Sequence, residues 1–243
     1  MKLTCFGKYG PYPKGGMATS CYMLTHGGKN VVIEMGCGAL SKLLEQINIA
    51  DIHAVALSHL HADHMGDMLT LRYALAAAKR MGHIDKPIPV YLPDFPTKEA
   101  SMLTANAMMD ATIIRSGMQC DIFGMKAQFA KMPHPVPSFA MSFEADGKKF
   151  VYSGDTQDNE KLAPFAKKAD LLLMDAAILT ASKIQNAPHL SAVDAGRIGR
   201  DADAKRMLIT HLFPEYDPAE VLAEAQQHYP DAEWIEENKQ YEV

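Results

Sequence analysis

The segment Ser58-His59-Leu60-His61-Ala62-Asp63-His64 places three imidazoles and one carboxylate within six residues. It directly follows the apolar run Ala54–Leu57, which has the character of a buried strand. In an extended chain, side chains two residues apart point to the same side, so His59 and His61 can face one ion together. Histidine and aspartate are typical ligands of zinc and iron, and their density here predicts a metal site.

The second half of this segment is expected to serve a second centre. Asp63 and His64 fall where the chain turns into a helical pattern that spans Met65–Met81. Because the backbone changes direction there, these two side chains can diverge from those of His59 and His61. The alternative is a polar loop with chance histidines, which does not explain three histidines and an aspartate in this register.

Three later residues are candidates for the remaining ligands. His134 lies in a proline-rich loop, where the flanking prolines hold the backbone extended and rigid. Asp155 follows the apolar run Phe150–Tyr152, and His211 follows Met207–Thr210 directly. Taken singly, each could be an ordinary loop or strand-end residue. The position of Asp155 and His211 after apolar runs favours ligands at the edge of a sheet, and His134 is the third candidate.

Short apolar runs and amphipathic stretches predict the rest of the organisation. The predicted strands are Leu3–Phe6, Cys21–Leu24, Val31–Glu34, Ala54–Leu57, Val90–Leu92, Met125–Phe129, Phe139–Phe143, Phe150–Tyr152, Leu171–Met174 and Met207–Thr210. The predicted helices are Leu40–Ile47, Met65–Met81, Thr97–Met109, Glu160–Lys168, Ala192–Asp201 and Pro218–His228. Strands dominate, with strand–helix alternation near the end of each half. We therefore expect one α/β domain over residues 1–243, with mixed sheets in layers.

Glycine and proline mark the predicted turns and loops. Gly27–Asn30 and Asp146–Lys148 each lie between two predicted strands and are typical of hairpins. The stretch Gly7–Ser20 carries little side-chain bulk and is predicted to be a loop. A plain surface loop and a wall beside a ligand site both fit this stretch.

The composition indicates a folded protein outside the membrane. Of 243 residues 48% are hydrophobic, and 24 Lys+Arg against 29 Asp+Glu give a net charge of −5. That charge provides no general attraction to nucleic acid or anionic lipid. There is no apolar run long enough to span a bilayer, no apolar signal region at the N-terminus and no CxxC pair among the four cysteines. We expect a cytoplasmic protein without disulfides.

The order HxHxDH, then His, Asp and His, resembles the metallo-β-lactamase superfamily. The resemblance extends over nearly the whole chain, from the predicted hairpin Ser20–Gly38 to His211. Val31–Gly38 looks like the "LLIDCG" strand and turn of that family, although Glu34 stands where the family has aspartate. The resemblance implies a four-layer αββα sandwich of two mixed β-sheets flanked by helices, with a two-metal site at one edge of the sheets.

The resemblance also implies a ligand set and a chemistry. One metal would take His59, His61 and His134, and the other would take Asp63, His64 and His211, with Asp155 between them. Two divalent ions, zinc first and manganese or iron as alternatives, could share a hydroxide formed at neutral pH and polarise the bond to be cleaved. The chain has no G-x-S-x-G elbow, so a metal-dependent hydrolase is expected rather than one with a side-chain nucleophile.

Two further segments resemble the ribonuclease Z/phosphodiesterase branch of the superfamily. Leu171–Ala177 is similar to the strand of that branch that ends in a "HEAT"-like signature, and Pro188–Ser191 is similar to its "HST" motif. In that branch an acidic residue orients a histidine that protonates the leaving oxygen, and here these residues would be Asp175 and His189. We therefore place His189, Asp175 and the ligand Asp63 among the catalytic residues.

The spacing of the ligands bears on the substrate. Ribonuclease Z proper carries a long basic arm for tRNA between the residues that correspond to His134 and Asp155, but only 20 residues separate them here. Together with the acidic net charge, this favours a phosphodiesterase that acts on a small cyclic or nucleotide-like diester. The alternatives are a ribonuclease Z-type tRNA 3′-processing endonuclease, and a lactonase or thioesterase of the same superfamily.

Other readings remain for the protein as a whole. A di-iron oxidoreductase of this superfamily normally pairs with a flavin module, and 243 residues leave no room for one. A non-catalytic binding protein would be expected to have lost ligands, yet all seven candidates are present. The expected partner is a small-molecule substrate, and the apolar stretch Leu69–Ala78 leaves open both core packing and contact with a second subunit in a homodimer.

Overall fold

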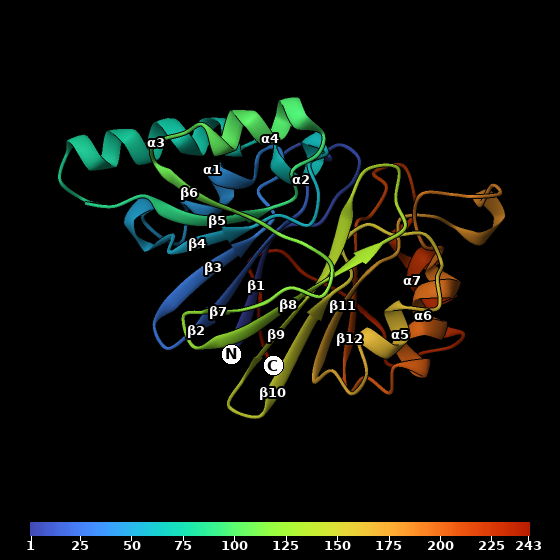
Figure 1. Ribbon diagram of the computed structural model, residues 1–243. Helices are drawn as coiled ribbons and strands as arrows, with labels where there is room; N and C mark the ends of the chain where they lie inside the picture. The colour runs from blue at the N-terminus through green and yellow to red at the C-terminus, as the bar shows by residue number, and fades with distance from the viewer.

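A computed structural model describes residues 1–243 and shows two seven-stranded β-sheets packed face to face. Helices cover the outer face of each sheet, α1–α4 on one side and α5–α7 on the other (Figure 1). The predicted αββα sandwich is therefore confirmed. No helix combines the length and the apolar character that crossing a membrane requires.

The first sheet comes mainly from the N-terminal half, with one strand from the C-terminus. Its spatial order is β14 (Gln240–Glu242), β1 (Lys2–Gly7), β2 (Cys21–His26), β3 (Lys29–Ile33), β4 (Ala54–Ala56), β5 (Ile88–Leu92) and β6 (Met109–Ile113). The strands from β14 to β3 pair antiparallel, and those from β3 to β6 pair parallel. The C-terminal strand thus closes the edge at which the chain begins.

The second sheet repeats this mixed pattern. Its spatial order is β13 (Glu233–Trp234), β12 (Met207–Thr210), β11 (Leu171–Asp175), β10 (Lys148–Tyr152), β9 (Ser138–Ala145), β8 (Met125–Met132) and β7 (Gln119–Ile122). The strands from β7 to β10 pair antiparallel, and those from β10 to β13 pair parallel. Neighbouring parallel strands have their carboxyl ends at the same edge of the sheet, so the residues that follow these strands lie close together.

The helices are short, and side chains cap several of them. They are α1 (Ala39–Leu43), η1 (Ile49–Asp51), α2 (Ala62–Met65), α3 (Met68–Arg80), α4 (Thr97–Thr104), α5 (Leu162–Phe165), η2 (Thr180–Ser182), α6 (Ala192–Asp201) and α7 (Pro218–Gln226). Ser191 caps α6 in a reciprocal capping box with Asp194. Asp217 caps α7 and Pro218 is its first residue.

Three apolar layers hold the sandwich together. One lies between the two sheets and includes Leu24, Phe129, Phe143 and Leu173. The other two lie between each sheet and its helices. Central strands such as β11 are buried on both faces, so they read as continuous apolar runs rather than alternating ones.

The structure divides the predicted helix Met65–Met81 into α2 and α3. Gly66 and Asp67 separate the two helices, and each has a tertiary partner. A side chain at Gly66 would meet the Cys37 thiol at 2.6 Å, while the Asp67 carboxylate accepts the Leu40 amide at 2.9 Å. The interruption follows from packing against α1 and the loop before it, which helical periodicity does not reveal.

The predicted helix Thr97–Met109 is wrong at its C-terminal end. Helix α4 stops at Thr104, and Asn106 turns the chain by accepting the Met108 amide at 2.8 Å. Met109 then begins β6, which pairs parallel with β5. The strands β6, β7, β13 and β14 were absent from the prediction, and all lie at or beside a sheet edge, where strands are short and half exposed.

Candidate metal centre

The seven predicted ligands all meet at one edge of the two sheets. Each comes from a segment just beyond a strand: four follow β4, and one each follows β8, β10 and β12. In the order of the chain these residues are His59, His61, Asp63, His64, His134, Asp155 and His211. Both sheets therefore supply ligands to the same cluster.

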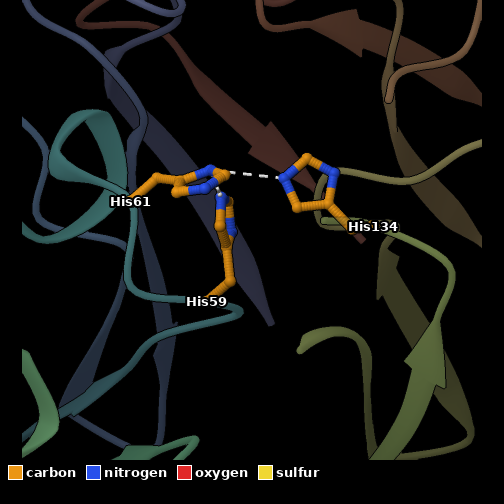
Figure 2. A group of neighbouring side chains, drawn as sticks. All are labelled: His59, His61 and His134. Carbon is orange, nitrogen blue, oxygen red and sulfur yellow. Dashed lines mark hydrogen bonds between the residues drawn. The ribbon is translucent and has the colours of Figure 1, made fainter. Parts of the chain in front are cut away.

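Three imidazoles form the first group of this cluster. His59 Nε2 lies 3.0 Å from His61 Nδ1, which lies 3.2 Å from His134 Nε2. Figure 2 shows the three rings directing these nitrogens toward one another. Nitrogen ligands about 2.0–2.1 Å from a tetrahedral zinc ion are roughly 3.3 Å apart. The spacing in the structure is close to that geometry.

Asp63, His64, Asp155 and His211 form the second group, and all four are buried. Asp63 Oδ2 lies 3.2 Å from His211 Nε2 and 3.6 Å from His64 Nε2. Asp155 Oδ2 lies 3.2 Å from each of the same two nitrogens. Two carboxylate oxygens and two imidazole nitrogens at these separations again suit a four-coordinate divalent ion.

Asp155 connects the two groups through a single oxygen. The Oδ2 atom that faces His64 and His211 also lies 3.6 Å from His59 Nε2 in the first group. An oxygen in this position can bind two ions at once, as the predicted bridging role requires. The other oxygen, Oδ1, is buried and has no hydrogen-bond partner.

The charge balance of the cluster also fits cations. Four carboxylates, those of Glu34, Asp63, Asp155 and Asp175, are at most 6% exposed. Every ion-pair partner of these four is a histidine; none is a lysine or arginine. Buried anions are costly unless they are paired or bind a metal. Divalent ions would supply the missing positive charge.

The protonation states of the first group and of Asp155 suit metal ligands. Burial lowers the pKa of His59, His61 and His134, so their rings are neutral near pH 7 and their lone pairs are free to bind. Burial raises the pKa of Asp155, but the surrounding histidines, His211 first, bring it well below its usual value. The proposed bridging carboxylate is therefore ionised.

Two of the candidate ligand rings are oriented by polar contacts on the side away from the cluster. His59 Nδ1 contacts Ser58 Oγ at 2.9 Å, and His134 Nδ1 contacts the Pro188 carbonyl oxygen at 3.0 Å. Such contacts fix which ring nitrogen faces the ion. Ser58 lies directly before the histidine motif in the sequence, but the partnership of His134 with a carbonyl 54 residues away has no sequence signal.

Glu34 lies behind His64. Its buried carboxylate accepts the Ser58 amide at 3.1 Å, and Oε1 lies 3.5 Å from His64 Nδ1. Burial raises the pKa of Glu34, and the neighbouring His64 opposes that shift. The residue that departs from the motif thus still faces a candidate ligand, although at 3.5 Å it does not make a hydrogen bond to His64.

Gly10 determines the room that is left for His211, and sequence reasoning did not single it out. The Gly10 amide donates to the Leu212 carbonyl oxygen at 3.2 Å, which holds the loop after β1 against the end of β12. A Cβ atom at Gly10 would lie 2.1 Å from His211 Cε1 and Nε2. The only signal in the sequence was the low side-chain bulk of Gly7–Ser20.

We expect the substitution Gly10→Ala to weaken metal binding at the second group by roughly 10–100-fold, because the His211 ring must move. The measurement is the metal content per chain after dialysis against a graded series of free zinc concentrations. Gly15→Ala in the same loop is the matched control, since a Cβ there meets nothing within 4 Å. Equal zinc retention by the two variants would contradict the steric role of Gly10.

His189 and Asp175 stand beside the second group. His189 Nδ1 lies 3.0 Å from Asp175 Oδ2, and its ring stacks on that of His211 with centroids 4.8 Å apart. Asp175 is buried, and its carboxylate also accepts the Ala177 amide at 3.1 Å. Burial lowers the pKa of His189, but Asp175 and then Asp155 raise it more, to about 9. The predicted contact between the two residues is present.

A mixed αββα sandwich with buried histidines and aspartates gathered at one sheet edge is the architecture of a metal-dependent hydrolase. Comparison with known protein families agrees with this class. The model of the beta-lactamase superfamily domain matches residues 30–212. The chain belongs to the metallo-β-lactamase superfamily, as the histidine motif predicted.

Some individual relatives match most of the chain, and another matches a part of it. "Probable metallo-hydrolase YhfI" of Bacillus subtilis (strain 168) is 30% identical over 212 residues, which cover 87% of each chain. The crystal structure of YhfI matches with a TM-score of 0.94 at 27% identity, covering 100% of this chain and 99% of that one. Human tRNase Z, short form, matches with a TM-score of 0.79 at 19% identity, covering 100% and 99%. Ribonuclease Z of Thermoplasma volcanium is 34% identical over 100 residues, which are 40% of this chain and 33% of that one.

Proposed function

We propose that this metal-dependent hydrolase is a phosphodiesterase that cleaves a small cyclic or nucleotide-like diester. The observation that carries the proposal is the contact of 3.0 Å between His189 and Asp175 beside the ligand cluster. Hydrolysis of a diester releases an alkoxide, which needs a proton, and histidine is the usual donor near neutral pH. The stretch of similarity to a ribonuclease Z, an enzyme named for cleaving a phosphodiester, supports the same chemistry.

The proposal assigns metal binding, proton donation and orientation of the donor to different residues. Two divalent ions, zinc by preference for this ligand set, would lower the pKa of water and polarise the phosphoryl group when bound. His59, His61 and His134 would hold one ion, and Asp63, His64 and His211 would hold the other, with Asp155 shared between them. His189 donates its proton to the leaving oxygen, and Asp175 fixes the orientation of its ring.

The hairpin between His134 and Asp155 supports a small substrate. These 20 residues form little more than β9 and β10, joined by a turn at Asp146 and Gly147. No arm for a large nucleic acid extends from this part of the chain. Together with the net charge of −5, this favours a small-molecule substrate over a pre-tRNA. We also propose a cytoplasmic location.

A substrate panel on the zinc-loaded protein tests this function. The panel contains bis(p-nitrophenyl) phosphate, cyclic nucleotides, an acyl-homoserine lactone, S-lactoylglutathione and a pre-tRNA. We expect kcat/KM to be highest for the small diesters. The lactone and the thioester lack a phosphoryl group, and the short hairpin between His134 and Asp155 provides no arm to hold a pre-tRNA. Turnover of the lactone or the thioester far above that of the diesters would overturn the assignment, and efficient pre-tRNA cleavage would favour the ribonuclease Z alternative.

A further inference from the structure

A small cavity adjoins the candidate metal centre on the side of the second group. Its volume is about 190 Å³, and the imidazoles of His189 and His211 form part of its wall. The rest of the lining comes from three loops, which follow β1, β11 and β12, through Gly10, Pro11, Ala177, Ile178, Phe213 and Tyr216. A pocket for a whole ligand has roughly 300–1,000 Å³. This cavity therefore has room for one group of a substrate.

Aromatic rings form the wall contributed by the loop after β12. Phe213 and Tyr216 meet edge to face, with centroids 5.0 Å apart and planes at 66°. Tyr12, which is 43% exposed, adds a third ring with its centroid 5.9 Å from that of Phe213. The Tyr12 hydroxyl donates to Glu215 Oε1 at 3.0 Å, which restrains this ring. Aromatic surfaces of this kind favour flat rings as partners.

The lining of the cavity carries no lysine, arginine, aspartate or glutamate. A second phosphate group would need cationic partners, and an ammonium group would need anionic ones. The two imidazoles belong to the metal ligands and to the proposed proton donor. The group that fits here is consequently uncharged.

The position of His189 identifies which part of the substrate enters the cavity. His189 lines it and is the residue proposed to protonate the leaving oxygen. The group attached to that oxygen therefore extends into the cavity, while the phosphoryl group stays at the ligand cluster. We propose that the cavity binds an uncharged flat ring of the leaving alcohol, such as an aryl group or a nucleobase. This inference rests on the proposed phosphodiesterase function and names its substrate class.

Calorimetric binding of two phosphonates to the zinc-loaded protein tests the cavity without any turnover. Phenylphosphonate and methylphosphonate carry the same anionic head, so the difference between their Kd values reports the ring alone. We expect the phenyl compound to bind more tightly to the wild type. Phe213→Leu and Tyr216→Leu should each weaken it by about fivefold or more, as expected for loss of a ring–ring contact. Ile178→Trp, which fills the cavity from the loop after β11, should have the same effect.

Unchanged methylphosphonate affinity in these variants shows that the fold and the metal centre are intact. Tyr73→Leu is the matched control, since Tyr73 is an exposed aromatic residue on α3 outside the cavity, and it should leave both affinities as in the wild type. Equal affinity of the two phosphonates for the wild type would overturn the proposal. So would phenylphosphonate binding within twofold of the wild type in both Phe213→Leu and Tyr216→Leu. The substrate panel tests the proposed phosphodiesterase function independently of these two results. A failure of the cavity proposal can therefore be distinguished from a failure of the proposed function.

Discussion

Replacing the shared carboxylate, Asp155→Asn, is expected to abolish diesterase activity and to remove at least one metal ion from the protein. A single oxygen of Asp155 faces His59 on one side and His64 and His211 on the other. The amide keeps the shape of the side chain but loses the negative charge that would face two cations. Loss of several kcal/mol of transition-state stabilisation corresponds to a rate reduction of roughly 10³-fold or more.

The measurement combines metal analysis by mass spectrometry with the rate of bis(p-nitrophenyl) phosphate hydrolysis. Asp158→Asn, three residues further along, is the matched control because this carboxylate is exposed and pairs with Arg197 at the surface. It should retain metal content and rate. If Asp155→Asn kept both at the level of Asp158→Asn, the bridging role would be wrong.

We expect the second large loss of activity from His189→Ala, which removes the proposed proton donor. We expect kcat to fall by about 10²–10⁴-fold for a diester with an alkoxide leaving group, such as a cyclic nucleotide. The p-nitrophenolate group leaves without a proton, so hydrolysis of bis(p-nitrophenyl) phosphate should fall much less. Metal content should stay unchanged, because His189 is outside the proposed ligand set.

The dependence on the leaving group separates proton donation from a structural defect, which would slow both substrates alike. Asp175→Asn should show a weaker form of the same pattern, since Asp175 acts through His189. The double variant should be no slower than His189→Ala, because the two residues form one unit. Equal losses on both substrates would exclude His189 as the donor.

Local sequence patterns were sufficient to predict which residues gather in the candidate metal centre. The segment His59–His64 contains four candidate ligands within six residues. His134, in its proline-rich loop, and then Asp155 and His211, each after an apolar run, follow in the order that the superfamily shows. Because the carboxyl ends of neighbouring strands meet at a sheet edge, this order along the chain translates into proximity in space. The contact between Asp175 and His189 was expected from the resemblance of their segments to two motifs of the ribonuclease Z/phosphodiesterase branch; Asp175 ends β11, and His189 lies in the loop before α6.

The remaining features depend on contacts between distant segments. Gly10 is separated from His211 by most of the chain, so nothing in a local window could indicate that its missing side chain makes room for that ring. Tyr12, the third ring beside the aromatic wall, meets Phe213 from the opposite end of the chain. The edge strands β13 and β14 consist of two and three residues, which is too short for a periodic pattern to emerge.

The division of ligands between the two sheets has a thermodynamic consequence. The N-terminal sheet supplies His59–His64, and the second sheet supplies His134, Asp155 and His211. Neither sheet alone can assemble either group, so in the unfolded chain the coordination set does not exist. The free energy of metal binding is then added to the free energy that holds the two sheets together. Bound ions would stabilise the contact between the two sheets. The supply of metal in the cell would then affect the stability of the folded protein as well as its activity.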